Sequence, residues 1–233
     1  MSDAVIDLTI DFRAESAGRD PDSYSPTLQR YHQLLWSKPL PSGAEFDLTA
    51  VKVGGARVLR HESALGVFVL SSDTLTNSNK NKLRPFYDRM RADVNAAWHR
   101  DAGSIGGRLV FPRNKIEGRQ TVNQERGTNH RIRDRFDLTL EAIRRHYVGQ
   151  QSPLTAALQR YADFFTLFGD FSGYVRFFLL DDLVHEGAVR FYLPFAGYDG
   201  SPLPQTFEAY QVFRAAQLAF VAARNSRIAA EIR

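Results

Sequence analysis

The chain has 233 residues with 43% hydrophobic content, and its 30 Lys and Arg residues outnumber its 26 Asp and Glu residues to give a net charge of +4. A chain of this length and apolar content can bury about 70% of the surface that it exposes when unfolded, which excludes intrinsic disorder. It has no cysteine, which excludes disulfides, thiolate nucleophiles and zinc sites built on sulfur.

The N-terminal third is predicted to consist mainly of strands. Apolar residues alternate with polar ones over residues 6–12, which is the period of a half-buried strand. Ser25 and Pro26 then form a typical helix start, an N-cap residue followed by proline, and this helix is expected to end near Trp36. Segments rich in Val, Leu and Phe predict further strands at residues 46–53, 56–59 and 67–70.

The middle of the chain is predicted to begin with a loop. Residues 71–82 are rich in Asn, Ser and Thr, which favour turns, so this stretch is also the best candidate for an internal boundary. Beyond it, the spacing of apolar residues predicts a helix over residues 85–100, and residues 105–111 have the composition of a strand.

The C-terminal half is predicted to be mainly helical. Residues 174–184 are apolar on most sides of a helix, so they are expected in the core or against a second copy of the chain. The fold class is therefore α+β, with mainly strands in the N-terminal part, mainly helices packed on a mixed sheet in the C-terminal part, and one globular domain over residues 1–233. The predicted helices span residues 134–147, 153–168, 172–185 and 207–225, with a further strand at residues 189–193.

The positive charge is concentrated in one segment. Residues 108–145 contain ten of the 30 Lys and Arg residues but only five acidic residues, so this segment carries +5 and the rest of the chain −1. Such a local excess creates a positive field that attracts phosphate groups or polyanions. The expected partner is therefore a phosphate-bearing ligand or a nucleic acid.

No segment is predicted to enter a membrane. The most apolar stretch, residues 174–184, has only eleven residues and includes three charges, whereas a spanning helix needs about 20 apolar residues. The first residues lack a basic region followed by an apolar run, and so they do not resemble a secretion signal. We therefore expect a cytoplasmic protein.

Within the basic segment, residues 113–137 are mostly polar or charged. Gly118 and Gly127 would let backbone N–H groups approach a ligand closely. Guanidinium groups and helix N-termini both bind phosphate oxygens, which makes this stretch a candidate anion site. The predicted ligand-binding residues are Arg113, Lys115, Arg119, Asn123, Arg126, Asn129, Arg131 and Arg133.

The alternative interpretation is that the charges of this segment neutralise one another. Asp134 and Asp137 are placed to cap the helix that they begin. Glu141 precedes Arg144 and Arg145 by three and four residues, the spacing of ordinary ion pairs along a helix, each worth about 0.3–0.5 kcal/mol. In that case these residues have a structural role rather than a catalytic one.

His130 and Glu125 are the candidate catalytic residues. His130 lies among Arg and Asn residues, whose positive charge favours the neutral imidazole that a general base needs; a solvated loop histidine is the alternative. No cofactor is predicted, because the chain lacks the glycine-rich loops that bind nucleotide phosphates in known motifs. No metal is predicted, because the six histidines have neither His-x-His nor His-Glu-x-x-His spacing.

Five sequence segments together resemble those of a known family, and they lie at residues 24–43, 105–107, 121–127, 134–141 and 161–184. They include Ile105-Gly-Gly, Thr121-Val-Asn and Phe178-Leu-Leu-Asp-Asp. In these segments the sequence is similar to a family of bacterial proteins catalogued as a domain of unknown function. The resemblance spans most of the chain, is weakest over residues 71–91, implies a single domain and brings no known activity.

The predicted function is binding of a phosphate-bearing ligand, either nucleic acid or nucleotide, by the basic segment. One alternative is a small-molecule hydrolase or transferase that uses His130 or Glu125 as base, and another is a non-enzymatic interaction module that forms homo-oligomers. A closed pocket of a few hundred Å³ that holds His130, Arg126 and Asn123 would favour the enzyme, while an open positive groove would favour nucleic acid.

Overall fold

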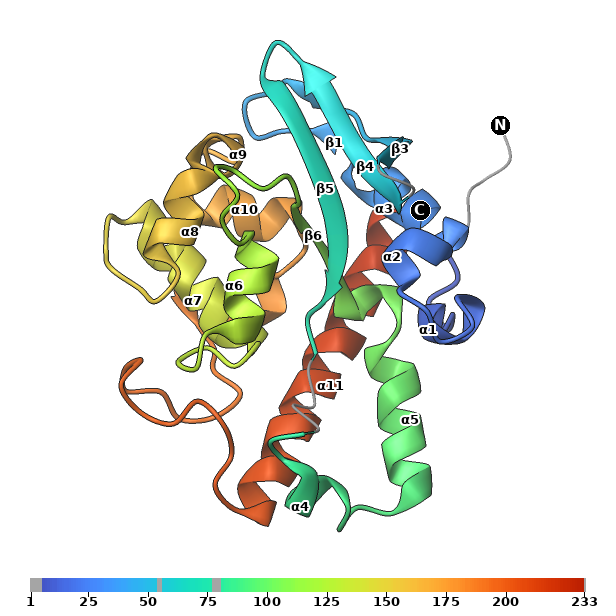
Figure 1. Ribbon diagram of the computed structural model, residues 1–233, viewed down its shortest axis with the longest axis vertical. Coiled ribbons are helices and arrows are strands. Elements are labelled where there is room, and N and C mark those ends of the chain that lie inside the picture. Colours follow the sequence, from blue (N-terminus) through green and yellow to red (C-terminus); the bar gives the residue numbers. More distant parts are fainter. Residues whose placement is uncertain (1–5, 54–55, 77–80, 233) are drawn as a thin grey trace.

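A four-stranded sheet lies between two groups of helices in the structure, a computed structural model that describes residues 6–53, 56–76 and 81–232. Figure 1 shows helices α6 to α10 on one side of the sheet and α1 to α3 on the other. The fold is α+β, as predicted. The strand pairs of the described residues are all antiparallel rather than mixed, because strands that follow one another along the chain lie side by side. The strands of this sheet, in order, are β3 Thr49–Val53, β4 Ala56–Ser63, β5 Gly66–Thr74 and β6 Arg108–Pro112.

Three short helices precede the sheet, and each is capped by a side chain that accepts a hydrogen bond from a backbone N–H group. Ser25 caps the third helix, so the helix predicted from Pro26 to Trp36 is confirmed. The strand predicted at residues 6–12 is wrong: no strand forms there, and Asp11 caps a helical turn instead. The three helices are α1 Phe12–Glu15, α2 Pro21–Tyr24 and α3 Pro26–Trp36.

Strand β5 is longer than predicted and has one open edge. It pairs with β4 only as far as Leu70, which lies opposite Leu59, and it continues to Thr74 paired with β6 alone. The loop predicted over residues 71–82 is therefore wrong for residues 71–74, because hydrogen bonds to β6 hold these polar residues extended; residues 77–80 lie outside the described residues. Helix α2 packs against β4 and β5.

Two small hairpins complete the strands. The segment predicted as one strand over residues 46–53 is divided between a hairpin and β3, and the strand predicted over residues 189–193 is limited to its first residue. The hairpins are β1 Lys38–Pro39 with β2 Glu45–Phe46, and β7 Val184–His185 with β8 Ala188–Val189.

Several predicted helices are interrupted. The helix predicted over residues 153–168 breaks at Tyr161, whose hydroxyl donates a hydrogen bond to the carbonyl of Asn114 at 2.8 Å. The helix predicted over residues 172–185 ends early, because Leu179 has a positive φ of 55°. The helices are α4 Arg84–Tyr87, α5 Ala92–Ala102, α6 Val122–Thr128, α7 Phe136–Tyr147, α8 Thr155–Arg160, α9 Ala162–Thr166, α10 Phe171–Phe177 and α11 Phe207–Glu231, with 3-10 turns at Ile105–Gly107 and Asp181–Leu183.

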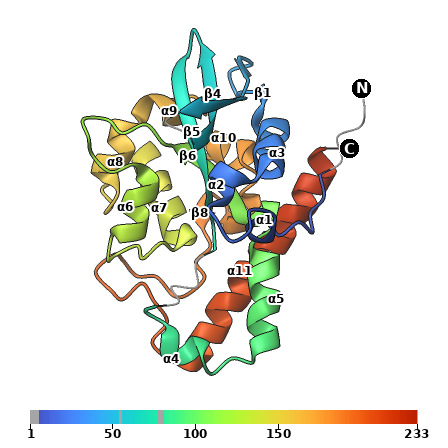
Figure 2. The ribbon, with the colours of Figure 1, turned by 45° about the vertical axis from the view of Figure 1, so that its right-hand side comes forward.

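The longest helix, α11, runs beside α5 (Figures 1 and 2). It carries polar and charged side chains along its length, including the buried Arg214 and Arg224. Within the described ranges, no helix combines the length and the apolar character needed to cross a membrane.

Aromatic side chains from distant parts of the chain meet in the core. Trp36 of α3 lies against Phe177 and Phe178, with ring centroids 6.2 and 5.2 Å away, and Phe168 packs on the same two rings. Phe177 is 4% exposed and Phe178 is fully buried. The apolar segment at residues 174–184 is thus covered by its own chain, and burying it does not require a second copy.

The fully buried guanidinium of Arg224 joins α11 to the sheet. It donates hydrogen bonds to the carbonyls of Gly106 and Arg108 at 2.8 and 2.6 Å, and to the carbonyl of Phe178 at 3.0 Å. Burial lowers the pKa of Arg224 to about 9, which still leaves it charged at neutral pH. Three buried carbonyls, two from the turn into β6 and one just after α10, are therefore satisfied by one side chain.

Gly106 permits the close contact between the turn before β6 and α11. A Cβ atom at this position would lie 2.5 Å from Oδ1 of Asn225 and 2.6 Å from the carbonyl oxygen of Val221. We expect Gly106→Ala to lower the free energy of unfolding by about 1–3 kcal/mol, measured by urea denaturation, because the packed backbone cannot move away. Gly127→Ala, in open space on α6, is the matched control and should be neutral or stabilising. Equal effects of the two substitutions would contradict this account.

The fully buried His32 should make stability depend on pH. Its Nδ1 accepts a hydrogen bond from Nε1 of Trp36 at 3.0 Å, and burial, aided by the charges of Arg224 and Arg108, lowers the pKa of His32 to about 3. The unfolded chain binds a proton at this residue below pH of about 6.5, and the folded chain does not. Relative to His32→Asn, the wild type should lose about 1.4 kcal/mol per pH unit as pH falls from about 6.5. A constant difference between the two proteins from pH 7 to pH 5 would argue against this.

Candidate functional site

A cavity of about 490 Å³ lies along the open edge of β5, and only polar side chains line it. We call this cavity the polar pocket. Its walls come from α2 and the residue before it, from the end of β5, and from the chain that joins β6 to α6 and begins α6 (Figure 1). Most small-molecule pockets are largely apolar, so this lining indicates a strongly polar ligand. The lining residues are Asp20, Asp22, Ser71, Ser72, Asp73, Arg113, Lys115, Thr121, Asn123 and Gln124.

The alternation of β5 sends neighbouring side chains to opposite faces of the sheet. Ser72 is two residues from Thr74, which pairs with Arg108, so Ser72 and Arg108 share one face, the face near Asp22 of α2. Asp73 points to the other face, where it contacts α6. Since no strand of the described residues covers the edge of β5 here, the polar pocket reaches carboxyl groups from both faces.

Arg126 forms the floor of the site on the α6 side. Its guanidinium is fully buried and makes ion pairs with Asp73 at 2.6 Å and with Asp134 at 3.1 Å. It also donates hydrogen bonds to Oγ1 of Thr139 at 3.2 Å and to Oδ1 of Asn123 at 3.4 Å. Arg126 therefore fixes the orientation of two residues that line the polar pocket, Asp73 and Asn123.

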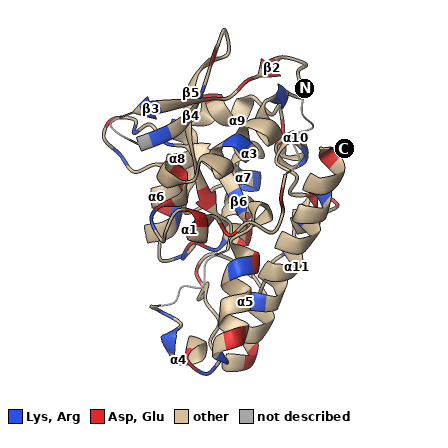
Figure 3. Cartoon of the chain, turned by 90° about the vertical axis from the view of Figure 1, so that its right-hand side faces the viewer, with Lys and Arg blue, Asp and Glu red and all other residues tan. Residues whose placement is uncertain are grey.

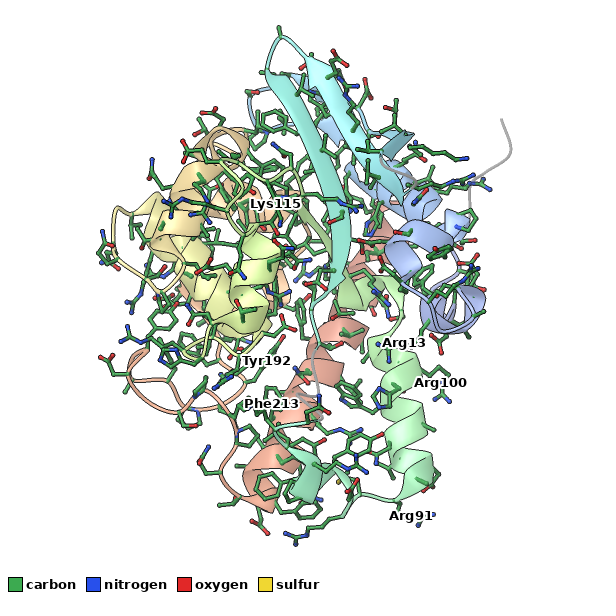
Figure 4. All side chains as sticks on the ribbon, viewed as in Figure 1. Arg13, Arg91, Arg100, Lys115, Tyr192 and Phe213 are labelled. Atoms are coloured by element: carbon green, nitrogen blue, oxygen red, sulfur yellow. The ribbon has the colours of Figure 1, made fainter. Side chains whose placement is uncertain are left out.

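Two cations, Arg113 and Lys115, stand at the pocket wall just after β6. The backbone N–H of Arg113 donates to the carbonyl of Val69 at 2.8 Å, which fixes where its side chain begins. Neither residue makes an ion pair with a carboxylate in the part of the chain that the structure describes. Figure 4 shows Lys115 between β5 and the helices that include α6 and α8. These charges are therefore available to a ligand.

The two central carboxyl groups, Asp22 and Asp73, differ in their surroundings. Burial, with the negative charges of Asp20 and Asp73, raises the pKa of Asp22 to about 8, and no described cation forms an ion pair with it. Burial also raises the pKa of Asp73, but the Arg126 guanidinium opposes this shift. The ion pair with a fully buried arginine keeps Asp73 ionised at neutral pH, where Asp22 is mainly protonated.

Two polar groups near these carboxyls are buried and lack a well-formed hydrogen bond to any described residue. The Ser72 hydroxyl lies close enough to Asp22 to lower its pKa slightly, yet it makes no well-formed hydrogen bond with a described residue, and Ser72 is 7% exposed. Nε of Arg108 likewise has no hydrogen-bond partner among the described residues, and Arg108 is 4% exposed. Buried polar groups are nearly always satisfied, so an unpartnered hydroxyl at a pocket wall indicates a place for a ligand.

The predicted ligand-binding residues are distributed over several places rather than one. Arg113, Lys115 and Asn123 line the polar pocket, and Arg126 lies beneath it. His130 and Arg133 line a second cavity, of about 540 Å³, together with Lys82 and residues 199–205. His130 therefore lines a different cavity from Asn123 in the described part of the chain, and Arg126 lines neither.

The remaining predicted residues lie elsewhere. Arg131 lines a third cavity, of about 390 Å³, and is 3.8 Å from a carboxylate oxygen of Asp199. The Asn129 side chain is used locally: its Oδ1 accepts a hydrogen bond from the backbone N–H of Arg131 at 2.9 Å. Arg119 is exposed and Glu125 is partly exposed, and neither lines the cavities described above.

The alternative interpretation of the basic segment holds for most of its second half. Glu141 makes ion pairs with Arg144 at 2.7 Å and Arg145 at 2.8 Å, as the helical spacing predicted. The capping prediction is wrong: Asp134 has a positive φ of 61° and pairs with Arg126, and buried Asp137 pairs with Arg135. Gly118, expected near a ligand, instead occupies a turn with a φ of +70° in open space.

The acidic wall of the polar pocket was missed by sequence reasoning. Asp73 lies in a stretch predicted to be a loop, and Asp20 and Asp22 flank a proline in a short helix. The only local signal was that residues 71–74, directly after a predicted strand, are all polar. Four polar residues in a row are unusual in a strand that is buried on one face. Among the described residues, no group of three or more His, Asp or Glu side chains is placed to hold a metal ion.

Comparison with known proteins identifies a family but no function. The model of a family of unknown function, DUF6994, matches residues 6–228. No curated protein and no solved structure matches the chain. The match covers nearly the whole chain, including all residues that line the polar pocket.

Arg126 and Arg113 should differ sharply in their effect on stability. Arg126→Met leaves Asp73 and Asp134 without their buried partner, so the free energy of unfolding should fall by about 3–5 kcal/mol. Arg113→Met removes an unpaired side chain at the pocket wall and should change it by about 0.5 kcal/mol or less. Chemical denaturation of both variants measures these changes. If Arg113→Met were destabilised and Arg126→Met were not, Arg126 would not be the structural residue of this site.

Proposed function

The chain belongs to DUF6994, a family of unknown function, and we propose that it binds a small phosphate-bearing molecule, such as a nucleotide or a sugar phosphate, in the polar pocket. The observation that carries this proposal is that Arg113 and Lys115 reach the pocket wall without a carboxylate partner among the described residues. A phosphate between them would receive charge-assisted hydrogen bonds, which are about twice as strong as neutral ones.

The opposite wall suits the rest of such a ligand. The carboxyl groups of Asp20 and Asp73 accept hydrogen bonds from hydroxyl or amino groups. Asn123, held by Arg126, has an amide N–H group to donate, and the Ser72 hydroxyl is unpartnered. A molecule with a phosphate at one end and several hydroxyls at the other therefore complements both walls.

Four observations favour a small ligand over a nucleic acid. The cavity volume of about 490 Å³ is in the range typical of small-molecule sites, about 300–1,000 Å³. Asp20 and Asp73 would repel a continuous phosphate backbone. In Figure 3 the Lys and Arg residues (blue) and the Asp and Glu residues (red) are interspersed along the chain rather than gathered in one part of it. No aromatic side chain lines the polar pocket to stack a base of a single strand.

The other functional predictions from the sequence remain predictions. They are a cytoplasmic location, a bacterial origin, homo-oligomers, and a base at His130 or Glu125, both outside the polar pocket. A second phosphate site at the cavity that holds His130 has less support, because apolar residues such as Phe86 and Leu203 contribute to that wall and cannot bind phosphate oxygens.

Isothermal titration calorimetry with nucleoside monophosphates, pentose phosphates, hexose phosphates and a short single-stranded oligonucleotide tests the proposal. We expect at least one small phosphate to bind. The double variant Arg113→Ala/Lys115→Ala should weaken it by about 100-fold or more, since each lost charged hydrogen bond is worth about 1.5–3 kcal/mol.

The matched control is Arg119→Ala/Arg131→Ala, which removes the same charge outside the polar pocket and should leave affinity within about threefold. Equal losses in the two double variants would mean that charge alone, rather than this pocket, binds the ligand. Tight binding of the oligonucleotide alone, falling steeply with salt, would replace the proposal with nucleic-acid binding.

A further inference from the structure

The geometry points to an active site in the polar pocket: we propose that Asp22 and Asp73 hydrolyse a glycosidic bond of a phosphorylated sugar or nucleotide, with Asp22 as general acid and Asp73 as general base. This inference rests on the proposed function, because the phosphate is the part of the substrate that Arg113 and Lys115 would hold.

The two carboxyls reach one cavity from different elements. Asp22 belongs to α2, and Asp73 belongs to β5, with its side chain on the α6 side of the sheet. Both line the polar pocket, and the negative charge of Asp73 contributes to raising the pKa of Asp22. A substrate in the pocket would therefore lie against both carboxyls, and glycosidic hydrolysis uses a pair of carboxyl groups that flank the bond to be broken.

The surroundings of the two carboxyls assign their roles. Oδ2 of Asp73 accepts a hydrogen bond from Arg126 at 2.6 Å, and Oδ1 accepts one from the backbone N–H of Thr74 at 2.8 Å. Both bonds favour the ionised form, which a general base needs. Asp22 has no ion pair among the described residues and is surrounded by protein and by other acids, so it keeps the proton that a general acid must donate.

The buried hydroxyl of Ser72 is the independent sign that the carboxyls face a ligand. Ser72 is 7% exposed, lines the polar pocket and has no well-formed hydrogen bond among the described residues. Its oxygen can donate to or accept from a sugar hydroxyl beside Asp22. Arg108, which interacts electrostatically with both Asp22 and Asp73, would stabilise the negative charge left on Asp22 after proton transfer.

In the proposed step, Asp22 gives its proton to the glycosidic oxygen or nitrogen as the bond from that atom to the anomeric carbon breaks. Asp73 removes a proton from a water molecule, whose oxygen forms the new bond to the anomeric carbon. The products are a sugar with a free anomeric hydroxyl and a protonated leaving group, and one water is consumed. Asp73 then loses its proton to solvent and Asp22 regains one. Acidic residues around the anomeric carbon suit this chemistry because the transition state is positively charged there.

The test measures whether the full chain hydrolyses two classes of substrate. The first is the 4-nitrophenyl and methyl glycosides of sugar phosphates, and the second is nucleoside monophosphates. We expect turnover of at least one class. Asp73→Asn should lower kcat by about 100-fold or more for every substrate that is turned over, while binding by calorimetry stays within about tenfold.

Asp22→Asn separates a catalytic from a structural role. A general acid matters little when the leaving group is as acidic as 4-nitrophenol, so kcat should fall less than about tenfold for the nitrophenyl substrate and about 100-fold or more for the methyl glycoside. A variant that merely distorts the pocket would lose both activities equally, and that result would overturn the role of Asp22.

The outcomes distinguish this inference from the proposed function. If a phosphate ligand binds through Arg113 and Lys115 but no glycosidic substrate is turned over at saturation, the pocket is a binding site only and the catalytic inference is wrong. If nothing in the panel binds, both proposals fail. Turnover that persists in Asp22→Asn/Asp73→Asn would also overturn the inference, because the activity would then arise elsewhere.

Discussion

The polar pocket depends on the ion pairs and hydrogen bonds of one buried side chain, the guanidinium of Arg126. A buried charge is costly unless it is paired and hydrogen-bonded, and Arg126 meets this need with Asp73 of β5, Asp134 before α7 and Thr139 within α7. These partners join α6 and the start of α7, which are neighbours along the chain, to Asp73, which is 53 residues before Arg126. By fixing Asp73, Arg126 also decides which way the end of β5 presents its carboxylate, and by binding Asn123 it positions the start of α6.

Buried arginines give this protein an unusual interior, and they decide the charge of the pocket wall. Arg224 satisfies backbone carbonyls without a carboxylate, Arg126 uses two carboxylates, and Arg108 has only the longer-range influence of Asp22 and Asp73. The carboxyls that compensate these charges lie at the open edge of β5. The acidic wall of the pocket is therefore a consequence of the cations behind it, while the opposite wall keeps the unpaired Arg113 and Lys115.

The charge count along the sequence located this region but could not describe it. The segment over residues 108–145 carries a real excess of positive charge, yet Arg126, Arg135, Arg144 and Arg145 are neutralised by carboxylates. Of these pairs, only those with Glu141 were predictable, because their partners are three and four residues apart on one helix. The ion pair of Arg126 with Asp73 depends on a contact between α6 and β5, and that of Arg135 with Asp137 depends on the burial of the start of α7. A count of charges contains neither.

Local physical rules determined what the sequence could reveal: the α+β class, helix α3 with its Ser25 cap, strands within β4 and β5, and the long C-terminal helix. These features depend on neighbours within a few residues, through capping, periodicity and turn composition. Only the tertiary structure decided that residues 71–74 are a strand, that Tyr161 breaks a helix, and that Asp22, Asp73 and Arg113 share one cavity. The reason is that these features depend on pairs of residues that are distant in sequence. Residues 71–74 bond to β6, the Tyr161 hydroxyl bonds to Asn114, and buried Arg126 pairs with Asp73. Such pairings outweigh local preference once the chain is packed.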